Sequence, residues 1–152
     1  MGFDYAMKIL LTVDGSKLSA VATQALIAEV KREGTEVRAI HVVDTRKELL
    51  PEMNASDAEV MNAPAQRRSA EALVETSAEL LRAESLKATT AVVWGDPRSQ
   101  IIDVAKDWRA DLTVLGSHGQ TGLKRFTMGS VSEAVSRYAP CSVEIVRPQS
   151  DQ

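Results

Sequence analysis

Five short runs of apolar, mostly β-branched residues recur along the chain, and none of them alternates cleanly between apolar and polar positions. Runs without alternation are typical of strands that are buried on both faces, as in a parallel sheet. Strands are therefore expected at residues 8–13, 37–43, 89–94, 112–115 and 143–146.

The first two segments between these runs carry helical patterns. Residues 18–30 place apolar side chains on one helical face, with Asp14 or Ser16 as the N-cap before them and Gly34 as a stop signal after them. A second helix with a weaker pattern is expected over residues 66–86.

The last two helices have clearer start signals. Asp96 followed by Pro97 is typical of an N-cap and first helical turn. Ser130, with Glu133 three residues later, predicts a capping box at the start of the final helix, which Pro140 ends. Strands and helices thus alternate, which predicts an α/β fold: a doubly wound, Rossmann-like, five-stranded parallel sheet with helices on both faces. Such sheets bind ligands beyond the C-terminal strand ends, where the winding direction reverses.

One stretch breaks this alternation. Residues 45–65 carry Pro51, Asn54, Asn62 and Pro64 and show no sustained period. A connection of this length is usually mobile, a lid or an interaction segment. We expect a flexible surface segment here, with a functional flap as the alternative. No other stretch suggests a boundary, so residues 1–152 are expected to form a single domain.

Composition and charge narrow the classes of partner. The chain has 152 residues, a formal net charge of −3 and 4% aromatic residues, which argues against a nucleic-acid partner. Cys141 is the only cysteine, so no disulfide forms within the chain and a reducing compartment is favoured. No apolar run approaches the roughly 18 residues of a membrane span, and the N-terminus lacks the order of a signal peptide. We expect a cytoplasmic protein without a membrane partner.

A glycine-rich loop follows the fourth expected strand. Gly116 and Gly119 come just after that strand, and Gly129 comes just before the last helix. Glycine permits positive φ and lets backbone N–H groups approach an anion, and a helix start favours negative charge. The loop predicts a site for phosphate or another anion; the alternative is a glycine-rich crossover with an ordinary helix cap at Ser130. Neither the Walker pattern nor the dinucleotide fingerprint is present.

The spacing of this loop, Gly-x-x-Gly, nine residues, then Gly-Ser over residues 116–130, resembles the ATP-binding motif of the universal stress protein family. The resemblance covers essentially the whole chain except residues 45–65. Its other anchors are Asp14 with Ser16, residues 41–44, Gly95-Asp96-Pro97 and Ala139-Pro140-Cys141.

The resemblance implies that the cofactor is ATP, with or without Mg²⁺. It also implies which residues contact the base and the sugar. Thr12 and Asp14 would lie beside the base and ribose, and Asp14 is the candidate metal ligand. Val42 would offer its backbone N–H and C=O to the adenine edge. Leu115 and Gly116 would line the ribose and the start of the phosphates.

For the phosphates, the resemblance implies contacts from both sides of the loop. His118 and Gly119 would contact them on the near side. The far side would be closed from the helix start by Gly129, Ser130, Val131 and Ser132. The other histidine, His41, is expected to be packed and hydrogen-bonded and not to be catalytic.

The implied function is an ATP-binding, nucleotide-responsive regulatory module of the stress response. The alternatives are a slow ATPase or nucleotide hydrolase, and a dimeric interaction protein with an unoccupied site. No catalytic residue is assigned, which favours a nucleotide-binding protein over an efficient enzyme. The resemblance also implies a homodimer through the last strand, Val143–Val146, although Glu144 departs from the apolar pattern expected there.

Overall fold

The strands of the chain form one parallel sheet. A computed structural model describes residues 7–30, 33–45, 55–117 and 128–147, and for residues 55–62 it describes the backbone alone. The sheet has the order β3-β2-β1-β4-β5, and every neighbouring pair is parallel. Its strands are β1 (Lys8–Thr12), β2 (Glu36–Val43), β3 (Lys87–Trp94), β4 (Leu112–Gly116) and β5 (Ser142–Val146).

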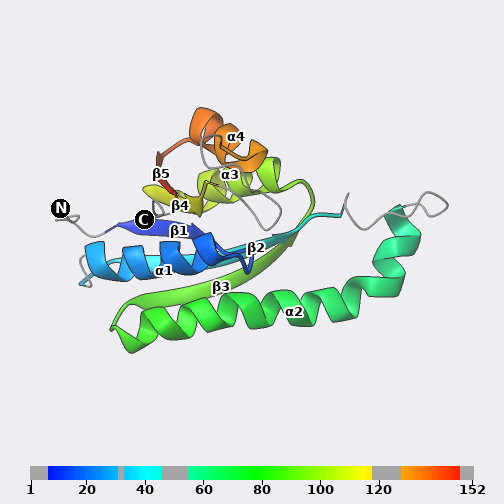
Figure 1. The fold of residues 1–152 in the computed structure, drawn as a ribbon, viewed down its shortest axis with the longest axis horizontal. Coiled ribbons are helices and arrows are strands. Elements are labelled where there is room, and N and C mark those ends of the chain that lie inside the picture. Colours follow the sequence, from blue (N-terminus) through cyan, green and yellow to red (C-terminus); the bar gives the residue numbers. More distant parts are fainter. Residues whose placement is uncertain (1–6, 31–32, 46–54, 118–127, 148–152) are drawn as a thin grey trace, which may run out of the picture.

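Helices cover both faces of this sheet. They are α1 (Lys17–Glu29), α2 (Ala55–Ala83), α3 (Pro97–Trp108) and α4 (Ser130–Tyr138). Figure 1 shows α1 and α2 below the sheet and α3 and α4 above it. The prediction of a doubly wound α/β fold is confirmed.

Two hydrophobic cores lie on the two faces. Leu11 of β1 packs with Leu26 of α1 and Leu81 of α2 in one core. Leu10, the preceding residue of β1, points the other way and packs with Ile101 of α3 in the second core. Successive residues of the central strand are thus buried on opposite sides, which explains why its sequence does not alternate between apolar and polar positions.

The helix starts agree with the sequence in one case and correct it in another. Asp96 caps α3, accepting from Arg98 N–H at 3.1 Å, and Pro97 is the first helical residue, as predicted. The predicted capping box at Ser130 is wrong, because Gly129 is the N-cap of α4 and Ser130 already lies inside the helix. A hydroxyl one position past the N-cap cannot reach the amide that an N-cap side chain would accept from.

The second helix is longer than expected. It begins at Ala55, not near residue 66, so residues 55–65 are helical although the sequence predicted an irregular segment over residues 45–65. Residues 46–54, the middle of that segment, lie outside the described residues. Pro64 removes one backbone donor and favours a kink without ending the helix. Figure 1 shows α2 bending toward its N-terminal end.

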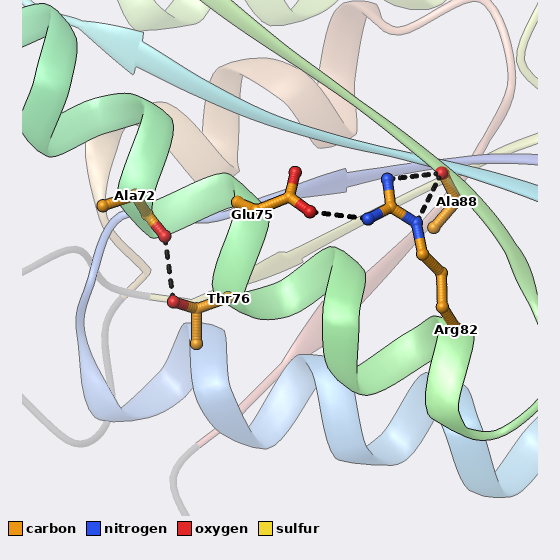
Figure 2. Close-up of polar contacts among 5 residues, drawn as sticks. All are labelled: Ala72, Glu75, Thr76, Arg82 and Ala88. Atoms are coloured by element: carbon orange, nitrogen blue, oxygen red, sulfur yellow. Dashed lines mark hydrogen bonds and ion pairs between the residues drawn. The ribbon is translucent and has the colours of Figure 1, made fainter.

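The C-terminal half of α2 is tied to the edge strand β3 by Arg82 (Figure 2). Arg82 Nε and Nη2 donate to the Ala88 carbonyl at 3.2 and 3.0 Å, and Nη1 meets Glu75 Oε2 at 2.6 Å. Gly95 N–H bonds Val43 of β2, so by the alternation of a parallel strand the Ala88 carbonyl faces outward. Arg82 therefore satisfies a backbone group at an open sheet edge.

Candidate functional site

The sheet reverses its winding direction between β1 and β4. From β1 the chain adds β2 and β3 on one side and later β4 and β5 on the other. A cavity of about 560 Å³ opens at the C-terminal ends of the strands at this reversal. It is lined by residues 12–14, 40–44 and 115–117 at the C-terminal ends of β1, β2 and β4, and by residues 129–132 at the start of α4. This is the position where doubly wound sheets bind ligands, and the volume suits a small molecule.

The Ser117 carbonyl joins the two ends of the glycine-rich loop. It accepts from Gly129 N–H at 2.7 Å and from Ser132 Oγ at 2.7 Å, while Ser117 N–H donates to the Val146 carbonyl at 2.8 Å. The start of α4 is therefore held against the end of β4. It follows that the Gly129 amide, which we expected to face an anion, is already paired with the protein.

The donors that α4 leaves for a ligand are the next three amides. Ser130, Val131 and Ser132 are the first residues of the helix, whose N–H groups have no carbonyl partner within it. All three residues line the cavity. Among the described residues nothing accepts from these three N–H groups, and they lie at the positive end of the helix dipole, which is the arrangement that attracts anions.

The glycines at the ends of this loop do not adopt the backbone conformation we expected. Gly129 has φ −69° and ψ 162°, and Gly116 belongs to β4. Positive φ occurs instead at Gly15, Gly34 and Gly95. The backbone at 116 and 129 therefore does not require glycine, and what the missing Cβ contributes there is space beside the cavity.

At the end of β2, Val42 is in register with Val93 of β3 but has no strand partner on its β1 side, which faces the cavity. The Ile40 carbonyl accepts from Val13 of β1, and the Val43 carbonyl accepts from Gly95 on the β3 side. Residues of a parallel strand alternate between their two neighbours, so Val42 N–H and C=O point to the β1 side. The β1–β2 pairing ends at Thr12 and Ile40, so no β1 residue pairs with them. A donor and an acceptor thus stand side by side in the cavity wall.

Two carboxylates enter the cavity after the first two strands. Asp14 follows β1 and accepts from Ser16 N–H at 2.9 Å, and Asp44 follows β2. Ser16, not Asp14, caps α1. Across the ranges that the structure describes, no three His, Cys, Asp or Glu side chains are grouped to hold a metal ion. Asp14 as a metal ligand therefore stays a prediction.

Most of the predicted site residues lie around this one cavity. Of the eleven, His118 and Gly119 lie outside the described residues. The other nine line it: Thr12, Asp14, Val42, Leu115, Gly116, Gly129, Ser130, Val131 and Ser132.

Sequence reasoning missed the wall that α2 contributes. Gln66, Ser69 and Leu73 line the cavity from one face of that helix. Their spacing of three and four residues was a usable signal for a shared helix face. Asp44 was also missed, although it follows β2 much as Asp14 follows β1.

In the part of the chain with described coordinates, no helix is both long enough and apolar enough to cross a membrane.

A doubly wound α/β sheet with a cavity at its winding reversal, where helix-start amides have no partner among the described residues, is the architecture of domains that bind small anionic ligands. The chain belongs to the universal stress protein family, whose family model matches residues 6–147. Universal stress protein MJ0531 of Methanocaldococcus jannaschii is 33% identical over 141 residues, covering 92% of this chain and 81% of that protein. Universal stress protein YxiE of Bacillus subtilis is 32% identical over 149 residues, covering 92% and 98%.

Solved structures agree with this assignment. The structure of hypothetical protein MJ0577 superposes with a TM-score of 0.83 at 28% identity, covering 95% of this chain and 98% of that one. More distant structures share the fold and were solved with adenine nucleotides. They are a universal stress protein with cAMP (20% identity, TM-score 0.64), an Arabidopsis thaliana family member with AMP (18%, 0.69) and an Archaeoglobus fulgidus universal stress protein with dAMP (18%, 0.62).

Proposed function

We propose that this protein binds an adenine nucleotide, ATP, and acts as a nucleotide-responsive regulatory module in the stress response. One observation carries the proposal: the N–H and C=O of Val42 and the first amides of α4, none of which has a partner in the described part of the chain, line a single cavity. The first pair suits a base and the second group suits phosphates. The adenine nucleotides bound by more distant family members support the same ligand class.

The phosphates are assigned to the start of α4. Ser130, Val131 and Ser132 offer three consecutive N–H groups, and the helix dipole adds a favourable field for an anion. Gly129 leaves room for the phosphates to approach those amides, because it has no Cβ. His118 and Gly119 are proposed as contacts from the other side of the loop.

The base and ribose are assigned to the strand ends. Adenine carries a ring-nitrogen acceptor next to its 6-amino donor, which matches the adjacent N–H and C=O of Val42. Thr12 and Asp14 lie beside the base and ribose, with the Asp14 carboxylate as acceptor for a ribose hydroxyl. Leu115 and Gly116 complete the wall toward the phosphates. A Mg²⁺ bound with the nucleotide would have Asp14 as its candidate protein ligand.

The direct test is the content of the purified protein. Denaturation should release an adenine nucleotide, identified by its absorbance and by chromatography against ATP, ADP, AMP and cAMP standards. Added ATP should raise the melting temperature of nucleotide-free protein by mass action, and GTP should raise it less. Absence of released nucleotide together with equal melting curves with and without ATP would overturn the proposal.

A substitution at Gly129 locates the phosphate end. Its φ of −69° and ψ of 162° suit a β-branched residue, so Gly129→Val adds bulk beside the cavity without straining the backbone. ATP affinity should fall by about tenfold or more, while the melting temperature without ligand stays near that of the wild type. Ser136→Val, at an exposed position near the far end of α4, is the matched control and should bind ATP normally. Unchanged affinity in Gly129→Val would contradict the assignment.

The regulatory readout is assigned to a homodimer. β5 is an edge strand of the sheet, and Val143 and Ile145 remain partly exposed on it. Pairing of Val143–Val146 with a second copy would cover this edge. A cytoplasmic location remains our prediction from the sequence, and fractionation of cells that express a tagged chain would test it.

A further inference from the structure

The ladder of hydrogen bonds between β1 and β2 stops one bond before it reaches Val42. Its last pair joins Thr12 and Ile40, and Val13 N–H donates to the Ile40 carbonyl at 2.8 Å. In a parallel ladder the next bond would run from Val42 N–H to the Val13 carbonyl. That carbonyl instead lies 2.7 Å from Nδ1 of the His41 ring. A side chain of β2 thus bonds the carbonyl that the backbone of β2 would meet next, and among the described residues Val42 N–H makes no bond to it.

The direction of this bond follows from chemistry. A carbonyl oxygen can only accept, so Nδ1 of His41 carries the hydrogen and donates it. The ring is therefore held in one orientation between the end of β1 and the cavity wall, of which His41 is itself a part. Among the described residues nothing pairs with the N–H or C=O of the next residue, Val42.

We propose that His41 is a positioning residue for the nucleobase: its ring donates to the Val13 carbonyl and holds it away from Val42 N–H, which ends the β1–β2 ladder early and keeps that N–H open to the cavity. This inference rests on the proposed binding of an adenine nucleotide, because the ligand group that Val42 receives is the amino and ring-nitrogen edge of a purine. His41 itself need not touch the base. It acts through the backbone of its neighbour.

Two variants separate this role from general packing. His41→Phe keeps a ring of similar size but has no donor, so Val42 N–H can complete the ladder to Val13. His41→Asn keeps a side-chain N–H at the place of Nδ1 and should preserve the bond to Val13. Circular dichroism and melting temperature check that both variants fold.

The first measurement needs no nucleotide. Amide hydrogen exchange by NMR should show that Val42 N–H exchanges at similar rates in the wild type and His41→Asn. In His41→Phe the Val42 N–H should exchange at least about tenfold more slowly than in the wild type, because that amide becomes hydrogen-bonded within the sheet. Equal exchange rates in all three proteins would overturn the inference, whether or not the protein binds ATP.

The second measurement is ATP affinity by titration calorimetry. His41→Phe should bind about tenfold more weakly, the loss expected when a neutral hydrogen bond to a base is removed. His41→Asn should bind within about threefold of the wild type. If His41→Asn binds as weakly as His41→Phe, the other ring nitrogen matters and the positioning role is wrong. If the wild type binds no adenine nucleotide but Val42 exchange changes as expected, the proposed function fails while the ladder-ending role of His41 stands.

Discussion

The two outer strands of the sheet, β3 and β5, end in different situations. Along β3, the guanidinium of Arg82 reaches from α2 and donates twice to the outward carbonyl of Ala88 (Figure 2). Along β5, no side chain among the described residues bonds to the strand backbone. An open edge is a template for pairing with another chain. The two edges thus differ in that α2 satisfies one outward carbonyl of β3, and β5 is the edge that we propose for pairing with a second copy.

The largest expected effect comes from removing the hydrogen bonds between Arg82 and the Ala88 carbonyl of β3. Arg82→Ala should lower the free energy of unfolding by about 2 kcal/mol, because the Ala88 carbonyl loses a charged donor at a strand position that is 8% exposed. Urea unfolding monitored by circular dichroism measures the change.

The matched control is the other partner of Arg82. The Arg82–Glu75 ion pair is 43% and 46% exposed, so Glu75→Ala should cost less than about 0.5 kcal/mol. If Glu75→Ala costs as much as Arg82→Ala, the ion pair on the helix surface matters and the bond to the edge strand does not.

A lysine on the open edge should weaken self-association. Val143→Lys in β5 should raise the dissociation constant of the proposed dimer by about tenfold or more, because a charge on an edge strand opposes pairing. Thr90→Lys in β3, the edge that α2 approaches, should leave it unchanged. Sedimentation equilibrium compares the two variants with the wild type, and equal dissociation constants would show that β5 is not the interface.

The smallest expected effect is a pH dependence at β5. Burial raises the pKa of the Glu144 carboxyl above its ordinary value of 4.5, and the charge and a hydrogen bond of nearby Glu29 raise it further. A raised folded-state pKa means that the native state binds the proton more tightly than the unfolded state. Stability should therefore be greatest below the ordinary pKa and decrease as the pH rises through the raised value.

The measurement is urea unfolding between pH 7 and pH 5. The free energy of unfolding should rise toward pH 5 by less than about 1 kcal/mol. Glu144→Gln should be more stable than the wild type at pH 7 and should lose this part of the pH dependence. An identical pH profile in Glu144→Gln would assign the dependence to other groups.

Much of the fold could be predicted because its determinants are local. The apolar run at residues 8–13 has no alternation because β1 is buried on both faces, and the Asp-Pro pair at 96 and 97 encodes its helix start within two residues. The winding reversal then follows from the order of elements. The individual site residues came from the resemblance to the universal stress protein family and not from local patterns, and nine of them line one cavity.

The rest depended on partners that are distant in sequence. The Gly129 amide is used by Ser117, and the Val13 carbonyl is used by the ring of His41. No local pattern reveals such pairs, because they depend on how the ends of different elements meet. The start of α2 was missed for the opposite reason: Pro64 is a strong local stop signal, but the helix continues through it.

The two hydrogen bonds that the Ser117 carbonyl accepts have a consequence for how the ligand contacts of this protein can change. Because Gly129 and Ser132 fasten the helix start directly to the end of β4, the framework does not depend on the intervening residues to keep those two ends together. Substitutions between Ser117 and Gly129 that change ligand contacts should therefore leave the attachment of α4 to β4 intact.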